Sequence, residues 1–136
     1  MVKHEYIARL TAARSARLAT LGPDDQPHLV AIVFAYDDGY IYSAVDHKPK
    51  KSTDLKRLRN IAANPNVSVL VDHYEADWSR LWWVRCDGTA RVVAAGSGHA
   101  HGLDLLVAKY RQYHGLRPPG PVIEIAVERI NGWSAV

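Results

Sequence analysis

The strand-like segments of this chain follow one another through short turns, and this spacing limits the folds open to it. The clearest turn is Asp37-Asp38-Gly39, which separates a strand expected over 28–36 from one expected over 40–45. An Asp-Gly pair between two such runs is typical of a tight hairpin, so the two strands should pair antiparallel. Parallel strands need longer, usually helical connections. The sequence therefore predicts a mainly β protein with packed helices, built as an antiparallel barrel rather than a doubly wound sheet.

Hydrophobic periodicity and breaks at glycine or proline predict the remaining elements. We expect helices over 3–14 and 103–113, and a third that follows the loop at 46–54 and ends at Asn64-Pro65-Asn66. Asp87-Gly88 lies in the middle of a long strand and predicts a bulge or a tight bend. The other strands expected from alternation or apolar runs are 17–21, 67–71, 81–94 and 123–128.

The strand expected over 28–36 is apolar on both faces. Val30, Ile32 and Phe34 fall on one side, and Leu29, Ala31, Val33 and Ala35 fall on the other. We expect residues 1–136 to form one domain, and a strand buried on both sides is unusual in so small a domain. A partner subunit or a ligand is therefore expected to lie on this strand.

Composition excludes several classes of protein. Hydrophobic residues make up 48% and charged residues 23% of the chain, which is ordinary for a folded protein and argues against disorder. Cys86 is the only cysteine, so an intrachain disulfide and a cysteine-based metal site are excluded. No segment has the apolar run of a signal peptide or of a membrane span. We expect a cytoplasmic protein with no membrane partner.

Positive charge is concentrated in one segment of the chain. The net charge is only +3, but six of the 17 lysines and arginines lie between positions 48 and 59. A local cluster of this size suits a small polyanionic ligand better than a nucleic acid, which needs a longer basic face. We therefore expect no nucleic-acid partner.

This basic segment has the layout of a phosphate-holding strand–loop–helix. The loop after the strand at 40–45 carries Lys48, Lys50 and Lys51, and Ser52 or Thr53 is a natural N-cap for the helix that follows. A helix N-terminus offers unpaired N–H groups and the positive end of a dipole, and lysines add mobile positive charge. A solvated basic loop is the alternative interpretation of the same residues.

Three other motifs predict no chemistry. Gly96-Ser97-Gly98 lacks the glycine spacing of a dinucleotide fingerprint and indicates a turn. The loop pair His99 and His101, and His73 with its neighbouring acids, lack the helical spacing of a zinc hydrolase, so we expect no metal site. Cys86 lies in the middle of a strand, where a buried and inert thiol is the ordinary interpretation.

Trp82 and Trp83 are adjacent in a predicted strand and therefore point to opposite faces. If one of them lies in the barrel core, the other is exposed unless a subunit or a flat ligand covers it. We favour the covered arrangement, because an exposed indole beside Arg85 is unfavourable. Trp133 could likewise close over a neighbouring subunit, or it could simply anchor the C-terminal segment.

Taken together, these segments resemble the split β-barrel flavin and deazaflavin proteins typified by pyridoxamine 5′-phosphate oxidase. The similarity covers roughly residues 15–133, and it depends on the order and spacing of several motifs. These motifs are Arg17-Leu18-Ala19-Thr20-Leu21, Gln26-Pro27-His28-Leu29-Val30, Tyr40-Ile41-Tyr42-Ser43 with the lysine loop, the run from Leu58 to Val69, and Asp87-Gly88-Thr89-Ala90-Arg91-Val92.

Within that family the chain looks most like the small proteins assigned to coenzyme F420, a deazaflavin whose tail carries a phosphate and several glutamates. The residues that carry this likeness are Asp72-His73-Tyr74, Asp77-Trp78-Ser79, Leu81-Trp82-Trp83-Val84-Arg85 and Gly132-Trp133. Pyridoxamine 5′-phosphate oxidases themselves have substrate-binding arginines and a longer C-terminal end than this chain. We therefore do not expect oxidation of vitamin B6.

The resemblance implies a homodimer with a cofactor at each subunit interface, and an oxidoreductase that moves a hydride between F420 and a small-molecule substrate. An FMN-binding oxidoreductase of the same fold, or a non-catalytic module that carries a cofactor or a small ligand, remains the alternative. Tyr42 or Tyr74 could donate a proton, but no catalytic residue is assigned. The expected cofactor-binding residues are Val30, Ile32, Val33, Tyr42, Ser43, Ala44, Lys48, Lys50, Lys51, Ser52, Thr53, Arg57, Trp82, Trp83 and Trp133.

Overall fold

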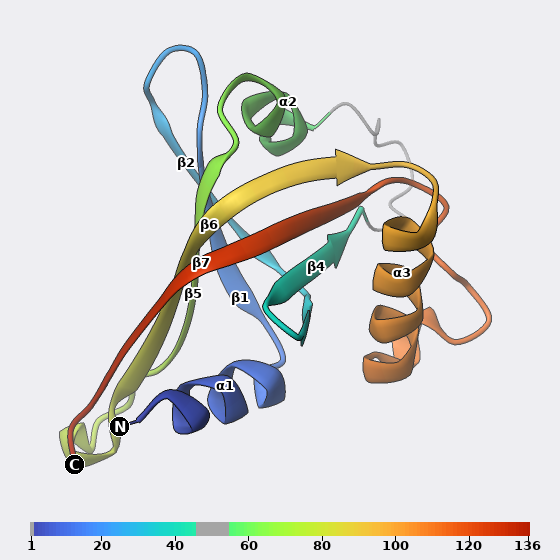
Figure 1. Ribbon diagram of the computed structural model, residues 1–136. Coiled ribbons are helices and arrows are strands. Elements are labelled where there is room, and N and C mark those ends of the chain that lie inside the picture. Colours follow the sequence, from blue (N-terminus) through green and yellow to red (C-terminus); the bar gives the residue numbers. More distant parts are fainter. Residues whose placement is uncertain (1, 46–54) are drawn as a thin grey trace.

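The computed structural model describes residues 2–45 and 55–136, and within them one antiparallel sheet of seven strands forms the body of the protein (Figure 1). The order across the sheet is β2-β1-β5-β6-β7-β4-β3. This confirms the predicted mainly β fold with packed helices. The strands are β1 Ala16–Leu21, β2 Pro27–Ile32, β3 Ala35–Asp37, β4 Tyr40–Ala44, β5 Asn66–His73, β6 Trp82–Val93 and β7 Val122–Ser134.

The sheet closes on itself at one short crossing. β2 and β3 lie at opposite edges of the sheet, yet only Val33 and Phe34 separate them in the chain. The two edges must therefore come close together, so the sheet curls into a barrel. The single strand expected over 28–36 was wrong, because the chain leaves one edge after Ile32 and joins the other at Ala35. Phe34, at the crossing, is fully buried in the core.

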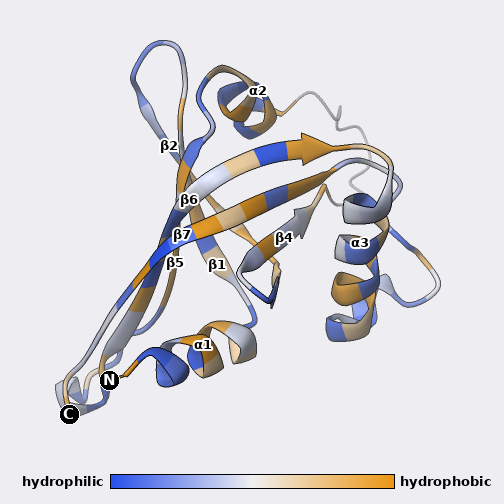
Figure 2. Cartoon of the chain, in the orientation of Figure 1, coloured by the Kyte–Doolittle hydropathy of each residue, from blue (hydrophilic) through white to orange (hydrophobic). Residues whose placement is uncertain are grey.

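Among the described residues, three α-helices cover the curled sheet (Figure 1). α1 (Lys3–Ala12) and α2 (Lys56–Ala63) lie at opposite ends, and α3 (Ser97–Lys109) lies beside β4. Hydrophobic and hydrophilic residues alternate along much of β6 and β7, as expected for strands with one face toward a core (Figure 2). The main core fills the inside of the sheet, and a second cluster packs α3 against β4. No helix among the described residues is long and apolar enough to cross a membrane.

A hairpin turn and a bulge expected from the sequence are confirmed. Asp38 and Gly39 both have positive φ, 44° and 86°, which is the backbone of a tight hairpin turn between β3 and β4. The pairing of β6 with β7 shifts register between Asp87 and Gly88, where a bulge was expected. Glycine is required at position 88, because a Cβ there would overlap the carbonyl oxygen of Ala126 on the neighbouring strand.

The start of α3 was predicted wrongly. The helix begins at Ser97 rather than Leu103, so Gly96-Ser97-Gly98 opens a helix instead of forming a turn. Two glycines in the first turns weaken the helical signal in the sequence. The packing explains them, because a Cβ at Gly98 would press against the Glu124 carboxylate and one at Gly102 would press against the Tyr42 ring. His99 and His101 are therefore helical, and they contact the Gly120 carbonyl and the Asp37 carboxylate.

The start of α2 also differs from the prediction. The helix begins at Lys56 with Leu55 as its N-cap, whereas the sequence placed the N-cap at Ser52 or Thr53, which lie outside the described residues. The buried side of this short helix is held to the barrel by Asn60, whose amide donates to the hydroxyl of Thr20 at 3.0 Å. α2 is thereby fixed beside the end of β1.

Candidate functional site

A small pocket opens where β2 and β4 end, close to α2. Its volume is about 180 Å³. Residues at both strand ends line it, at the points where the chain stops pairing with its neighbouring strands. Five of the expected cofactor-binding residues line this pocket, from three separate segments of the chain: Ile32, Val33, Ser43, Ala44 and Arg57. Ser15 and Ala31 complete the lining. Serine and alanine are common residues that carry no binding signal in a sequence. Ser15 comes near β4 only in the folded chain.

The walls of this pocket are joined by a direct hydrogen bond. The hydroxyl of Ser43 donates to the carbonyl oxygen of Val33 at 2.8 Å. Ser43 is buried, so this bond replaces one that a sheet partner would make at the crossing between β2 and β3. Ser43 therefore holds the end of β2 against the end of β4.

The other expected cofactor-binding residues have different positions. Lys48, Lys50, Lys51, Ser52 and Thr53 lie outside the described residues, so their assignment stays a prediction. The Tyr42 side chain packs in the second cluster with α3 rather than in the pocket lining, and Val30 packs against the main core. Burial and the nearby Glu124 and Asp37 carboxylates raise the pKa of Tyr42.

The tryptophans expected to shield the cofactor lie on β6 and β7. Trp82 and Trp83 begin β6, and Trp83 is the register partner of Trp133 on β7. As expected, the two neighbours point to opposite faces: Trp82 packs against the main core, and Trp83 lines a groove on the outer face. Trp133 is 43% exposed. Within one chain, none of the three lines the small pocket.

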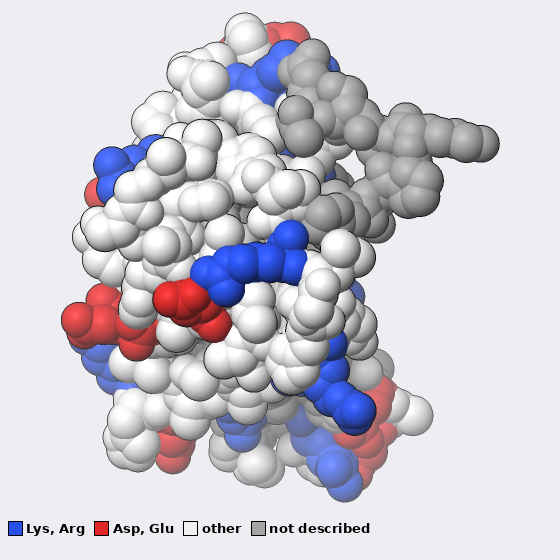
Figure 3. Space-filling model, turned by 90° about the vertical axis from the view of Figure 1, so that its right-hand side faces the viewer, with Lys and Arg blue, Asp and Glu red and all other residues white. Residues whose placement is uncertain are grey.

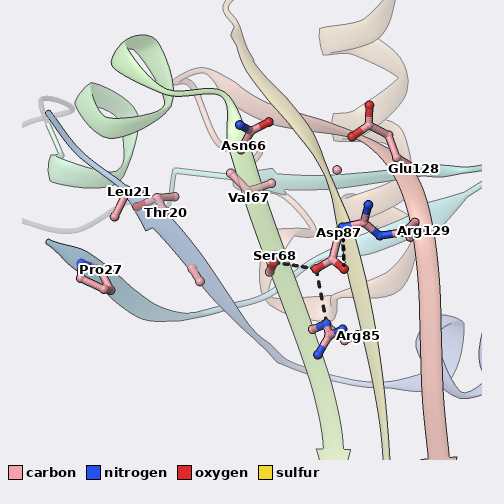
Figure 4. A pocket seen from close by; sticks show the side chains of 12 residues that line it. Thr20, Leu21, Pro27, Asn66, Val67, Ser68, Arg85, Asp87, Glu128 and Arg129 are labelled. Carbon is pink, nitrogen blue, oxygen red and sulfur yellow. Dashed lines mark hydrogen bonds and ion pairs between the residues drawn. The ribbon is translucent and has the colours of Figure 1, made fainter. Parts of the chain in front are cut away.

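A larger, polar pocket of about 680 Å³ lies on the outer face of the sheet across β1, β5, β6 and β7 (Figure 4). Asp87 sits among its labelled side chains and accepts a hydrogen bond from the Ser68 hydroxyl at 2.7 Å. The guanidinium groups of Arg85 and Arg129 each lie 3.4 Å from this carboxylate. The Ser68 hydrogen bond and the two arginines hold the pKa of Asp87 below its usual value.

The bulge explains how this polar cluster forms. Asp87 pairs with Arg129 and Gly88 pairs with Val127, so Glu128 is an extra residue in β7. Glu128 and Arg129, which would point to opposite faces in a regular strand, both line the pocket. The sequence indicated the bulge, but the partners of Asp87 depend on strand register and were not predicted.

On the face shown in Figure 3, the lysines and arginines among the described residues are scattered, and several lie beside an Asp or Glu. Among the described residues, Arg91 pairs with the buried carboxylate of Glu124, with 2.7 Å between Nε and Oε1. A duplex or a long single strand needs a continuous basic face. The described part of this face gives no support to such a role.

A family model described as pyridoxamine 5′-phosphate oxidase matches residues 2–134. The chain belongs to this family. The split-barrel resemblance read from the sequence is therefore confirmed, whereas assignment to the F420 branch stays a proposal. No curated protein matches the sequence.

Solved structures share this fold. A conserved hypothetical protein from Mycobacterium tuberculosis has a TM-score of 0.81 at 22% identity, over 99% of this chain and 86% of that one. An FAD-binding protein from Mesorhizobium loti has a TM-score of 0.73 at 27% identity, over 97% and 94%. HutZ, a heme storage protein from Vibrio cholerae, has a TM-score of 0.74 at only 14% identity, over 97% and 93%, and so shares the fold alone.

In this member of the pyridoxamine 5′-phosphate oxidase family, an apolar groove of about 500 Å³ adjoins the polar pocket and shares Ala19, Ser68 and Arg85 with it. Leu29 is 68% exposed there and Tyr74 is 63% exposed. β2 is thus not buried on both faces within one chain, and its outer face meets solvent. The remaining groove residues are Arg17, Leu70, Asp72 and Trp83.

Proposed function

We propose that this protein is an F420-dependent oxidoreductase that moves a hydride between the deazaflavin cofactor and a small organic substrate. The observation that carries the proposal is the pocket at the ends of β2 and β4, where five residues expected to bind the cofactor meet. Arg57 brings positive charge to this pocket, and the lysine-rich segment 46–54 directly follows β4 in the sequence. Membership of the pyridoxamine 5′-phosphate oxidase family supports a flavin-type cofactor.

The pocket residues fit part of such a cofactor. The lining of Ala31, Ile32, Val33 and Ala44 offers a mostly apolar wall, which suits a flat ring, and Arg57 suits a phosphate or the carboxylates of a tail. The cofactor supplies the hydride chemistry, and the protein orients it and excludes water. In this role Ser43 would position the Val33 carbonyl, and the backbone of residues 31–33 would contact the ring.

The size of the pocket favours a site shared between two subunits. Its volume of about 180 Å³ is below the roughly 300–1,000 Å³ of a typical small-molecule site. A second copy of the chain would supply the missing wall, and the outer-face groove is the surface we propose for it. Leu29, Leu70 and Trp83 are apolar, and Arg17 and Asp72 at the same groove have opposite charges, which suits a contact between two identical faces.

This homodimer is tested by Leu29→Lys, with Leu116→Lys as the matched control. Both leucines are largely exposed, at 68% and 57%, but only Leu29 lines the groove. Light scattering after gel filtration should show a dimer for the parent protein and for Leu116→Lys, and a monomer for Leu29→Lys. A monomeric parent protein would refute the shared site.

FMN is the alternative cofactor, and the FAD-binding protein from Mesorhizobium loti at 27% identity favours a flavin over F420. Titration of the cofactor-free protein with F420, FMN and FAD, followed by tryptophan fluorescence, separates the two. Tight binding of F420 alone supports the proposal, whereas preference for FMN or FAD moves the protein to the flavin branch. Because several charges would hold the F420 tail, the affinity for F420 should also fall faster with rising salt than the affinity for FMN.

The phosphate-holding role of the lysine loop is tested by a Lys50→Ala, Lys51→Ala double variant. Its cofactor dissociation constant should rise about tenfold or more, because charge-assisted contacts to a phosphate are lost. Lys3→Ala is the control, since Lys3 is exposed on α1 and lies in another part of the sequence. Equal affinity in the parent and the double variant would refute the assignment of these lysines.

A non-catalytic carrier is the second candidate, since HutZ shows that this fold also serves heme storage in Vibrio cholerae. Turnover distinguishes the two functions. Reduced F420 should be oxidised in the presence of some member of a panel of enones and quinones if the protein is an enzyme. Tight F420 binding without turnover of any panel member would favour a carrier.

A further inference from the structure

The crossing from β2 to β3 leaves backbone groups without strand partners, and two side chains at the end of α3 bind them. The Phe34 N–H donates to the hydroxyl oxygen of Tyr110 at 3.0 Å. The Phe34 carbonyl oxygen lies 2.8 Å from the Tyr110 hydroxyl and 2.8 Å from the Lys109 ammonium. Both polar groups of Phe34 are therefore satisfied by α3 instead of by a neighbouring strand.

The same two side chains bind the segment that joins α1 to β1. The Lys109 ammonium donates to the Ala13 carbonyl at 2.6 Å, and the Tyr110 hydroxyl lies 3.0 Å from the Arg14 carbonyl. Arg14 contacts both residues in turn. Its guanidinium carbon lies 4.8 Å from the centre of the Tyr110 ring, and its guanidinium donates to the Lys109 carbonyl at 3.2 Å. Lys109 and Tyr110 thus tie together two segments that are about twenty residues apart in the chain.

Each of these segments continues directly into the pocket at the ends of β2 and β4. Val33 precedes Phe34 and Ser15 follows Arg14, and both line that pocket. We infer that Lys109 and Tyr110 are positioning residues that clamp two walls of the cofactor pocket, although neither side chain lines it. This inference rests on the proposed function of the pocket.

The setting of Lys109 agrees with such a clamp. Its ammonium lies 4.2 Å from the centre of the Phe34 ring, and burial together with the Arg14 charge lowers its pKa to about 8. A lysine placed there loses hydration, and among the described residues it contacts the carbonyl oxygens of Ala13 and Phe34 and two aromatic rings rather than a carboxylate. The carbonyl contacts therefore account for its position.

The test compares Tyr110→Phe with Tyr6→Phe. Each variant deletes one hydroxyl that binds backbone, but Tyr6 contacts the Gly132 carbonyl at 3.2 Å, away from the pocket. Two quantities are measured well below the unfolding temperature of every variant: hydrogen exchange at the Phe34 amide, and the dissociation constant for whichever of F420 or FMN the parent protein binds. Lys109→Met and Lys109→Arg form a second pair, because arginine keeps the charge and the donors.

The clamp predicts faster exchange at Phe34 and about tenfold weaker cofactor binding in Tyr110→Phe, with neither change in Tyr6→Phe. Lys109→Met should weaken binding, and Lys109→Arg should retain most of the affinity. Unchanged affinity in Tyr110→Phe, despite faster exchange at Phe34, would overturn the positioning role. A parent protein that binds neither cofactor would refute the proposed function instead, and the exchange rates would still decide whether these side chains hold the pocket wall.

Discussion

The buried thiol of Cys86 predicts a specific loss of stability at alkaline pH. Cys86 is 1% exposed, and burial, with a smaller contribution from Asp87, raises its pKa from an ordinary 9.0 to about 12. Between these values the unfolded chain has lost the thiol proton while the folded chain keeps it, so the free energy of unfolding falls as the pH rises. Each pH unit corresponds to about 1.36 kcal/mol, so Cys86 should account for a loss of about 2 kcal/mol by about pH 10.5.

Urea denaturation of the parent protein and Cys86→Ala, at about pH 7.5 and pH 10.5, measures this loss. The variant should be less stable at the lower pH by about 1–2 kcal/mol, because it leaves a small cavity. Its further loss on going to the higher pH should be about 2 kcal/mol smaller than that of the parent. Lys109, Tyr42 and Tyr110 also have shifted pKa values, but they are present in both proteins and cancel in this comparison. An equal alkaline loss in both proteins would refute the reasoning.

Three further predictions concern single contacts. Gly88→Ala should lower the free energy of unfolding by more than about 2 kcal/mol, because its Cβ would overlap the Ala126 carbonyl; a parent-like urea midpoint would contradict this. Asn60→Ala and Thr20→Val should each lower the free energy of unfolding by about 1–3 kcal/mol, because each leaves a buried partner unsatisfied. A double-mutant cycle should show coupling between the two substitutions. Because the pKa of Asp87 is lowered from its ordinary value of 3.8, its stabilising contribution is present above that value and is lost as the pH falls through the lowered value. The acid-induced loss of stability should therefore be smaller in Asp87→Asn than in the parent protein. Identical acid titrations of the two proteins would contradict this.

Five of the seven residues that line the candidate pocket were expected near a cofactor from the sequence, whereas Ser15 and Ala31 were not. Ile32, Val33, Ser43 and Ala44 were expected near a cofactor, and they do meet at one pocket with Arg57. Tyr42 was expected there too, but its side chain packs in the cluster with α3. Side-chain direction beyond the β alternation depends on what packs against each face, and the early start of α3 was not visible because of its glycines.

The polar pocket and the clamp could not be predicted from local pattern. Ser68 and Asp87 are 19 residues apart, and Tyr110 and Phe34 are 76 residues apart. Nothing in the sequence near either residue of a pair indicates the other. Their contacts depend on strand register and on where α3 docks, which are properties of the whole fold.

The sequence by itself determined the order of the elements, the antiparallel hairpin at Asp38-Gly39 and the bulge at Asp87-Gly88. These features follow from turn chemistry and alternation within a few neighbouring residues. Only the tertiary structure decided that the expected strand over 28–36 splits at Phe34, so that the sheet edges meet and the strand ends enclose a pocket. That closure is physically non-local, because it depends on burying Phe34 inside the barrel and on satisfying its backbone with side chains from a distant helix.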